Sequence, residues 1–202
     1  MALDPNTEPQ MMHPLRVWLS GSDVGASVAQ GNAVQAAAEL TRPTDTNAYA
    51  IGDAIANSTT AASVTPLQFT VARGTGGAGR INGAQLMVDS ATAFGAIRLH
   101  LFNTTPFAAA GFQADNAALA LTYTAIKTGS AGSNPNYIGY IDFPTFTALS
   151  ASAVANGVCD LTELNFDTAS GSSVIFGLLE ARAAFTPANG GKFNVSLDVI
   201  QD

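Results

Sequence analysis

Two histidines and one cysteine are the residues of this 202-residue chain best suited to catalysis or metal binding. His13 lies among prolines, His100 lies in the segment IRLHLF, and Cys159 stands alone in GVCDLTEL. A serine hydrolase needs a nucleophile, a histidine and a carboxylate held together, and the chain has no G-x-S-x-G motif. A zinc site needs about four neighbouring ligands, which these residues do not supply. We therefore expect no enzyme activity, no cofactor and no metal, and we interpret Cys159 as a small buried hydrophobe.

Two further features have a chemical and a structural interpretation. Arg98 and His100 would share one face of a strand as a solvated or interface-facing pair, and a catalytic base is the alternative for His100. The segment R-GTGGAG-R, residues 73–80, would bind phosphate only if its glycines opened a helix. A strand pattern follows them instead, so we expect a hairpin loop. Acidic residues that we interpret as turn and cap residues rather than calcium ligands are Asp160, Glu163 and Asp167.

Charged residues are scarce in this chain. Only 11% of the residues are charged and the net charge is −7, whereas an average soluble domain has about 25% charged residues. Eight basic residues are too few to form a nucleic-acid or anionic-membrane footprint. We also expect no transmembrane helix and no secretory signal. A surface with few charges loses little hydration on contact, which indicates burial in an assembly.

Apolar and polar residues alternate with period two from residue 34 onward, which predicts antiparallel strands with one face on a core. We predict nine or so strands, no helix beyond about two turns, and a hairpin at PANGG, residues 187–191. The fold class is an all-β antiparallel sandwich, with a jelly roll as the leading version. The expected strands lie at 34–41, 67–71, 84–89, 97–101, 137–143, 160–166, 173–185 and 193–199, with a weaker one at 118–124. A short helix is the most that the alanine-rich segment 107–120 would form.

Residues 1–33 differ in composition from residues 34–202. They contain three prolines and then a run of small residues, which remove hydrogen-bond donors and offer little to pack. We predict an extended N-terminal arm at 1–33 and a sandwich domain at 34–202. The bulky apolar residues of the arm are predicted to contact a partner, and they are Leu15, Val17, Trp18 and Leu19.

One segment, LTRPTDTNAYAIGDAIANS at residues 40–58, contains the pattern R-P-x-D-T-x-A-Y-x-x-G-D. This pattern resembles one that recurs in small virion structural proteins of tailed bacteriophages. Segments 98–103, 115–121 and 137–143 are similar to the same group. The resemblance implies a capsid cement or decoration protein, made in the host cytoplasm and placed on the capsid exterior. It also implies the major capsid protein as partner and a homotrimer as oligomeric state.

The residue types of this motif can also be explained by the fold, without a partner. Pro43 would end the first strand, Asp45 would cap a turn through its side chain, and Gly52 with Asp53 would form a second turn. Tyr49 would pack its ring and bond its hydroxyl to a partner. We therefore expect a strand–turn–strand corner that serves the fold more than direct partner contact.

Two other functions remain open from the sequence. One is a carbohydrate- or receptor-binding module of a phage fibre or baseplate, which requires exposed aromatic residues. The other is an enzyme such as a virion-associated depolymerase. The aromatic residues available for the first are Phe107, Phe112, Tyr137 and Phe146.

Overall fold

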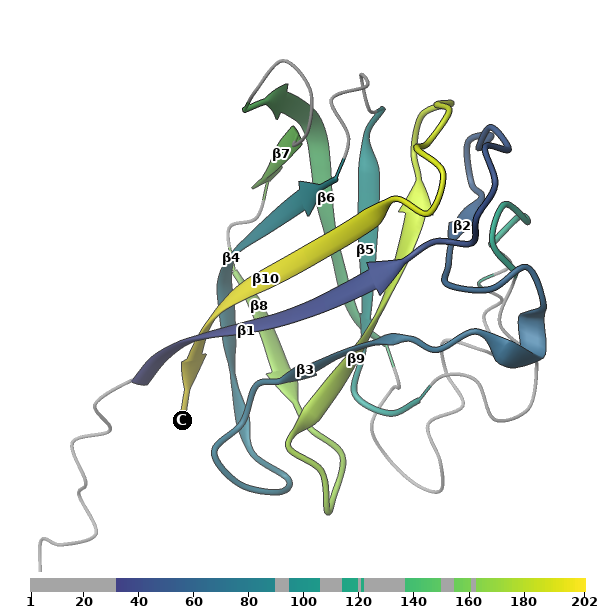
Figure 1. Cartoon of the computed structure of the whole chain (residues 1–202). Helices are drawn as coiled ribbons and strands as arrows, with labels where there is room; N and C mark the ends of the chain where they lie inside the picture. Colours follow the sequence, from purple (N-terminus) through teal and green to yellow (C-terminus); the bar gives the residue numbers. More distant parts are fainter. Residues whose placement is uncertain are drawn as a thin grey trace, which may run out of the picture. The chain divides into compact units, whose positions relative to one another are not determined.

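The computed structural model describes residues 32–89, 95–105, 114–119, 121, 137–149, 155–160 and 163–202, and only the backbone of residues 32 and 155–160. Their regular structure consists of ten β-strands and one 3-10 turn, η1 (Ala61–Ser63) (Figure 1). The prediction of an all-β chain is confirmed, because η1 is the only helical element within these ranges.

The strands follow each other along the chain with these bounds: β1 (Asn32–Thr41), β2 (Ala54–Ile55), β3 (Leu67–Thr70), β4 (Ala78–Val88), β5 (Ile97–Phe102), β6 (Tyr137–Ala148), β7 (Ala155–Asp160), β8 (Leu164–Asp167), β9 (Val174–Ala181) and β10 (Lys192–Gln201).

Two antiparallel sheets pack against each other. The first contains β1, β10 and β4 side by side, with β8 paired to the beginning of β4. The second contains β6, β5 and β9, and β9 also pairs with β2 and β3. Strand β7 pairs with both β4 and β6 and so connects the two sheets along one side. The sandwich is thus confirmed, and its jelly-roll connectivity stays a prediction.

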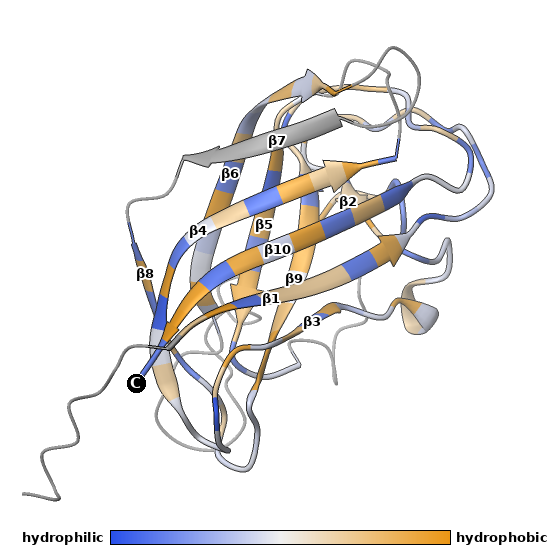
Figure 2. Ribbon diagram, turned by 60° about the vertical axis from the view of Figure 1, so that its left-hand side comes forward, coloured by the Kyte–Doolittle hydropathy of each residue, from blue (hydrophilic) through white to orange (hydrophobic). Residues whose placement is uncertain are grey.

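Strands β1 and β10 show why the period-two pattern gives this sheet. Their register is unbroken, from Asn32 opposite Gln201 to Thr41 opposite Lys192. Ala36 pairs with Leu197 and Leu40 with Phe193, and all four side chains are buried. The alternation of hydrophilic and hydrophobic residues along β10 is visible in Figure 2. A slip of one residue would turn every buried side chain to solvent, so this register is strongly specified.

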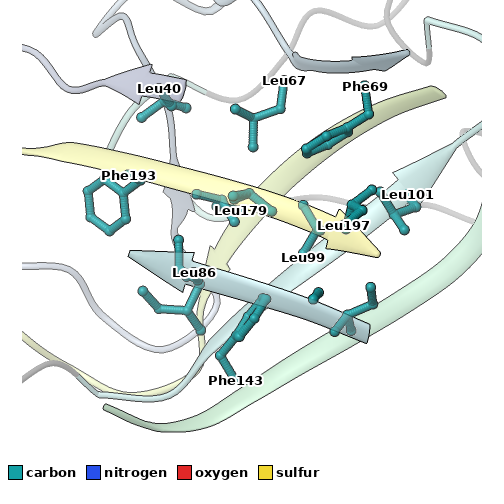
Figure 3. Close-up of a cluster of buried hydrophobic side chains, with 14 of the residues drawn as sticks. Leu40, Leu67, Phe69, Leu86, Leu99, Leu101, Phe143, Leu179, Phe193 and Leu197 are labelled. Carbon is teal, nitrogen blue, oxygen red and sulfur yellow. The ribbon is translucent and has the colours of Figure 1, made fainter. Parts of the chain in front are cut away.

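The core fills the space between the two sheets. Leucine and phenylalanine side chains from both sheets point into it (Figure 3). Burying one such side chain contributes about 1.5–3 kcal/mol relative to exposing it. Completely shielded members of this core include Phe69, Phe143, Phe193, Leu86, Leu99 and Leu101.

Two predicted hairpins were wrong. The PANGG turn joins β9 to β10, and the glycine-rich loop joins β3 to β4, but neither pair of strands is hydrogen-bonded together. Each connection instead crosses from one sheet to the other. At PANGG the turn is closed by the Gly191 N–H bonding the Ala188 carbonyl, and Gly190 takes a positive φ of 62°. PANGG therefore forms a turn, as predicted, but the strands that it joins pair with other neighbours.

Some strand bounds also differ from the prediction. The single strand expected at 160–166 is two strands, because β7 ends at Asp160 and β8 begins at Leu164. β4 begins at Ala78, inside the predicted glycine-rich loop, and β9 ends at Ala181, before Phe185. β1 begins at Asn32 and takes in the last two residues assigned to the arm. The rest of the arm, most of 118–124 and much of 107–120 lie outside the described residues.

Candidate functional site

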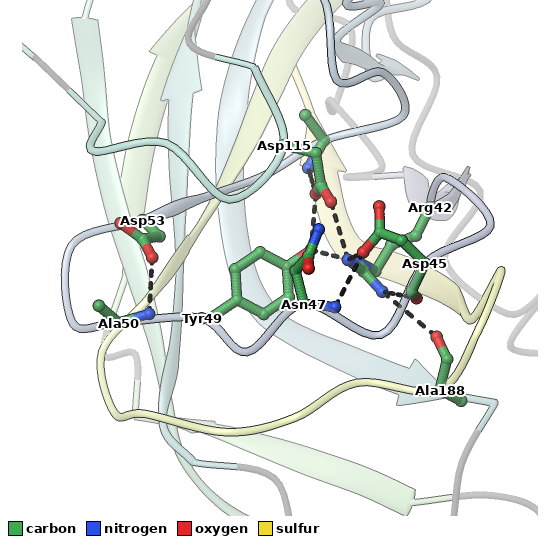
Figure 4. A network of polar contacts seen from close by, with 9 residues as sticks. Arg42, Asp45, Asn47, Tyr49, Ala50, Asp53, Asp115 and Ala188 are labelled. Carbon is green, nitrogen blue, oxygen red and sulfur yellow. Dashed lines mark hydrogen bonds and ion pairs between the residues drawn. The ribbon is translucent and has the colours of Figure 1, made fainter.

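The corner that follows β1 encloses a buried ion pair (Figure 4). Nη2 of Arg42 lies 2.8 Å from Oδ2 of Asp115, which is 73 residues away in sequence, and water reaches neither side chain. Tyr49 completes the arrangement. Its hydroxyl donates to Oδ1 of Asp115 at 2.6 Å and accepts a hydrogen bond from Nε of Arg42. The three side chains therefore form one closed polar group.

All donors of the Arg42 guanidinium have acceptors. Nη1 donates to the carbonyl oxygens of Asp45 and Ala188, at 3.3 Å each, and Nη2 donates to Oδ1 of Asp45 at 3.1 Å as well as to Asp115. With the bond from Nε to Tyr49, the five N–H donors of a guanidinium are used. A group so fully bonded holds the backbone around it in place and has no donor left for a ligand.

Burial and hydrogen bonding also fix the charge states in this group. Burial by itself would lower the pKa of Arg42, but the interactions with Tyr49 and Asp115 outweigh it and raise the pKa. Burial, with the hydrogen bond to Asp115, raises the pKa of Tyr49. The backbone N–H of Ala56 donates to Oδ1 of Asp115 at 2.8 Å and adds a further donor to the carboxylate. Arg42 therefore stays charged and Tyr49 stays neutral near pH 7.

The remaining motif residues shape the turns of this corner, as predicted. Oδ1 of Asp45 accepts the N–H of Asn47 at 3.0 Å, and Oδ2 of Asp53 accepts the N–H of Ala50 at 2.6 Å. Gly52 has a φ of 92°, which a residue with a side chain rarely adopts. The interpretation of the motif as a fold element is supported residue by residue.

A second polar cluster lies on the outer face of the β6–β5–β9 sheet. Nε2 of His100 lies 2.9 Å from Oε2 of Glu180, and Nδ1 lies 3.0 Å from the Tyr137 hydroxyl. Nη1 of Arg182 donates to the other oxygen of Glu180 at 3.1 Å. His100 is only 5% exposed, so the solvated form of the predicted Arg98–His100 pair is wrong for His100, and the interface-facing form stays a prediction.

The reason for this burial is a small apolar cluster beside His100. Phe102 and Leu178 on the same outer face are buried, and partly buried hydrophobic residues pack against them. These residues are Val64, Leu119, Leu121, Tyr137 and Phe176. The outer face of this sheet is therefore partly covered by the chain itself, which the strand pattern does not reveal.

His100 lies between a carboxylate and a hydroxyl, as the histidine of a catalytic triad does, and its surroundings change the pKa of both His100 and Tyr137. Burial lowers the pKa of His100, the contact with Glu180 opposes this, and Arg98 and Arg182 add to the lowering. Burial raises the pKa of Tyr137 to about 12. An activated nucleophile needs a lowered pKa or a base that takes its proton near neutral pH. Both His100 and Tyr137 are therefore uncharged near pH 7, and the Tyr137 hydroxyl is not activated by a lowered pKa of its own.

The exposed part of this cluster contains an arginine, a carboxylate and an aromatic ring. Nε and Nη2 of Arg98 donate to the two oxygens of Asp142 at 2.7 and 2.8 Å. This bond lowers the pKa of Asp142. The guanidinium carbon of Arg98 lies 3.9 Å from the ring centre of Tyr140, whose side chain is about half exposed. The three groups contact one another on the partly exposed outer face of the sheet.

The loop rich in glycine is packed against a neighbouring loop. The N–H of Gly76 donates to the Ser172 carbonyl at 2.7 Å, and the Thr168 hydroxyl donates to the Gly77 carbonyl at 3.0 Å. No helix follows this loop, so it lacks the geometry for phosphate binding. Within the described ranges, histidine, cysteine, aspartate and glutamate form no group of three that would hold a metal ion.

Many residues singled out from the sequence lie outside the described part of the chain. The predicted contact residues Leu15, Val17, Trp18 and Leu19 lie outside the described residues, as do His13, Phe107, Phe112 and the side chain of Cys159. Of the acidic residues 160, 163 and 167, Glu163 forms an exposed ion pair with Arg80 at 3.5 Å. Phe146 packs against the core, and Tyr137 is partly buried.

Sequence reasoning missed the residues that complete both clusters. The sequence singles out Asp115 only as part of segment 115–121, and it assigns neither Glu180 nor Tyr140 to a site. Tyr140 had one usable signal, because in the alternating segment 137–143 it shares a face with the polar Asp142. Asp115 and Glu180 had none, because their partners lie far away in the sequence.

No family model, no curated protein and no solved structure matches the chain. The part of the chain that the structure describes has no helix long and apolar enough to cross a membrane.

Proposed function

We propose that this chain is a non-enzymatic structural protein that binds the outside of a tailed-phage capsid and stabilises it. In this proposal its partner is the major capsid protein, it acts as a homotrimer, and it is made in the host cytoplasm before joining the virion. A protein that binds the assembled shell more tightly than the separate subunits raises shell stability by linkage. The task needs well-shaped surfaces and no catalytic group.

The proposal is supported by one observation above others. The segments that resemble virion proteins are far apart in the sequence, yet they contact each other in the fold. Arg42 and Tyr49 of the first segment bond Asp115 of another, and Arg98 bonds Asp142 across β5 and β6. The residues that carry the resemblance therefore bond one segment to another in the folded chain.

The surface composition supports the same role. Charged residues make up 11% of the chain, and several charges of the described part bond each other within the molecule. An interface built from uncharged small residues loses little hydration when it closes.

The test uses shells assembled without this protein. Purified protein mixed with such shells should sediment with them and raise the temperature at which they fall apart. Unassembled capsid subunits should bind more weakly than shells. Absence of co-sedimentation at protein concentrations well above that of the shell sites would contradict the proposal.

A second candidate function has one observation in its favour. Tyr140 offers an exposed ring, and Asp142 beside it offers carboxylate oxygens, which are groups that a sugar-binding surface uses. If the chain is a carbohydrate-binding module, Tyr140→Ala should abolish retention on immobilised host polysaccharide. Retention that is equal for wild type and variant, or absent for both, would contradict this second function.

A further inference from the structure

A chain of two hydrogen bonds crosses the outer face of the β6–β5–β9 sheet, from Glu180 through His100 to Tyr137. Nε2 of His100 lies 2.9 Å from Oε2 of Glu180, and Nδ1 lies 3.0 Å from the Tyr137 hydroxyl. The Glu180 carboxylate also accepts a hydrogen bond from Arg182 at 3.1 Å, so it acts as an acceptor toward both neighbours. The proton of a neutral His100 therefore lies on Nε2, and the bare Nδ1 accepts the hydroxyl hydrogen of Tyr137.

A proton added to His100 would reverse the second of these bonds. Both ring nitrogens of a charged histidine are donors, so Nδ1 could no longer accept from Tyr137. The Tyr137 hydroxyl would have to accept instead, and no other group in the described part of the chain accepts its hydrogen. Protonation of His100 therefore conflicts with the closed arrangement, in which the residue is 5% exposed.

Tyr137 lies beyond an irregularity at the beginning of β6. It pairs with Phe102, whereas Gly139 pairs with Leu101, so Ile138 is an extra residue that forms a bulge. Gly139 has a φ of 152°, which residues with a side chain rarely adopt. The first residues of β6 are therefore separated from its regular pairing with β5, which begins at Gly139, and they can move while that pairing stays in place.

The partner of Tyr137 is followed by two buried polar atoms that lack hydrogen bonds. Oδ1 of Asn103 and Oγ1 of Thr104 come directly after Phe102 in the chain, and neither has a partner among the described residues. A buried polar atom without a partner destabilises the closed form relative to a form that water can enter. The region around Phe102 is thus one where local opening has a low cost.

The closed form covers apolar side chains at this place. Phe102 and Leu178 are buried on the outer face of the sheet. The ring of Tyr137 packs edge-on against Phe102, with 5.3 Å between the ring centres. A movement of Tyr137 would therefore uncover apolar surface and let water reach His100.

The titratable and charged groups that face His100 come from three strands, and they are Arg98 on β5, Asp142, Tyr137 and Tyr140 on β6, and Glu180 and Arg182 on β9. The hydrophobic residues that pack beside them from outside the strands are uncharged. Arg98 already bonds Asp142, and Arg182 already bonds Glu180. A charged His100 would find no unpaired carboxylate among these groups.

We propose that His100 and Tyr137 form a pH-sensitive switch, which opens the outer face at the beginning of β6 when His100 takes up a proton. The opening exposes Phe102 and Leu178, so the protein gains apolar surface in acid while the sandwich stays folded. This inference goes beyond the proposed function and does not depend on binding to a capsid.

Linkage gives the size of the effect. In the open form His100 is solvated and titrates near the ordinary histidine pKa of about 6.5, whereas burial lowers its pKa in the closed form. The open form therefore takes up the proton first as the pH falls. The ratio of open to closed molecules should rise by up to about 25-fold between pH 7 and pH 5.

The test measures the binding of anilinonaphthalene sulfonate, a dye that fluoresces on apolar surface, together with the far-ultraviolet circular dichroism. The wild type should bind the dye at pH 5 but not at pH 7, with an unchanged circular dichroism spectrum. His100→Gln should show no increase, because its amide can donate to Glu180 and accept from Tyr137 at every pH. His13→Gln is the matched control, since it removes the other histidine of the chain, and it should respond like the wild type.

A second measurement needs no variant of the switch. Amide hydrogen exchange followed by nuclear magnetic resonance should show that the beginning of β6 opens up to about 25-fold more often at pH 5 than at pH 7, after correction for intrinsic exchange. This measurement on the wild type decides the question if His100→Gln does not fold.

Three results would overturn the switch. The first is a wild type that binds no dye at pH 5 and whose opening at β6 does not change with pH. The second is an equal increase in dye binding for the wild type and a folded His100→Gln, because the opening would then not depend on His100. The third is dye binding that appears only together with loss of the circular dichroism signal, because the whole sandwich would then unfold.

Discussion

Arg42 and Asp115 carry opposite charges at a place that water does not reach, and this arrangement has a cost. Removing two ions from water costs several kcal/mol each, which their attraction offsets only when the geometry is good and other hydrogen bonds are satisfied. Here Tyr49 and the backbone supply those bonds. We infer that the pair mainly selects one conformation of the corner, and that loss of either partner leaves an uncompensated charge.

A double-mutant cycle measures this coupling. Arg42→Met and Asp115→Asn should each lower the free energy of unfolding by about 3–5 kcal/mol, because each leaves the remaining partner with a buried charge that nothing compensates. The double variant should lose clearly less than the sum of the two single losses. Urea unfolding followed by far-ultraviolet circular dichroism, which reports on the backbone, provides the free energies of unfolding. Additive losses would show that the two side chains act independently.

His100 gives the protein a predicted pH dependence. Burial lowers the pKa of His100 below its ordinary value of 6.5 in the folded state. When the pH falls below about 6.5, the unfolded chain therefore binds a proton before the folded chain does. The free energy of unfolding should decrease between pH 7 and pH 5, with up to one extra proton bound on unfolding. Thermal unfolding at a series of pH values tests this.

The matched control is His100→Gln, which keeps a donor near Glu180 but does not titrate. In this variant the free energy of unfolding should change less between pH 7 and pH 5 than it does in the wild type, whatever the absolute stability of the variant. Asp142, whose pKa is lowered by Arg98, contributes only at pH values near and below 3.8. A wild-type protein whose stability is flat across the window would contradict the burial of His100.

At the scale of residues, the sequence predicted the turns of the corner but not the buried aspartate that completes its hydrogen bonds. Pro43, Asp45, Tyr49 and Gly52 act within a few residues of each other, and their types alone indicate turns and a bonded hydroxyl. The acceptor that closes the group comes from Asp115, which the chain places there only through the fold. No local pattern distinguishes this aspartate from the exposed ones.

At the scale of elements, alternation predicted the strands well and their partners poorly. The positions of β1, β3, β5 and β10 follow from which residues can face a core, which is a local property. Pairing is decided by which strands share a sheet, and here the β3–β4 and β9–β10 connections cross between sheets. A turn sequence such as PANGG fits both a hairpin and a crossing, so composition does not choose between them.

Gly79 shows how closely the elements approach each other. A Cβ at this position would lie 2.4 Å from the Ile200 carbonyl oxygen and 2.9 Å from the Phe166 ring. Gly79→Ala should therefore destabilise the protein by about 1–3 kcal/mol, as overpacking does. Gly74→Ala is the control, since a Cβ there meets nothing within 4 Å. Chemical unfolding of both variants checks this, and equal stability would mean that β4 and β10 move apart easily.

At the scale of the whole molecule, the low charge content predicts self-association. We expect a homotrimer, with a mass in solution about three times 20.6 kDa. Light scattering coupled to size exclusion measures this mass at several concentrations and at two salt concentrations. Because few charges are involved, added salt should not dissociate the trimer. A monodisperse monomer at high concentration would contradict the prediction.

We predict that the N-terminal arm contributes to binding of the shell, whereas the sandwich domain folds without it. Residues 1–31 precede β1, so their removal leaves all ten strands in place. The deletion variant should fold with an unchanged circular dichroism spectrum but bind shells more weakly. If these four side chains are buried on a partner, each would contribute about 1.5–3 kcal/mol before the cost of ordering, and they are Leu15, Val17, Trp18 and Leu19.

A full-length variant with serine at these four positions should show the same weakening, which separates side-chain contacts from chain length. Equal co-sedimentation of all forms would remove the arm from the interface, and unfolding of the deletion variant would make the segment part of the core.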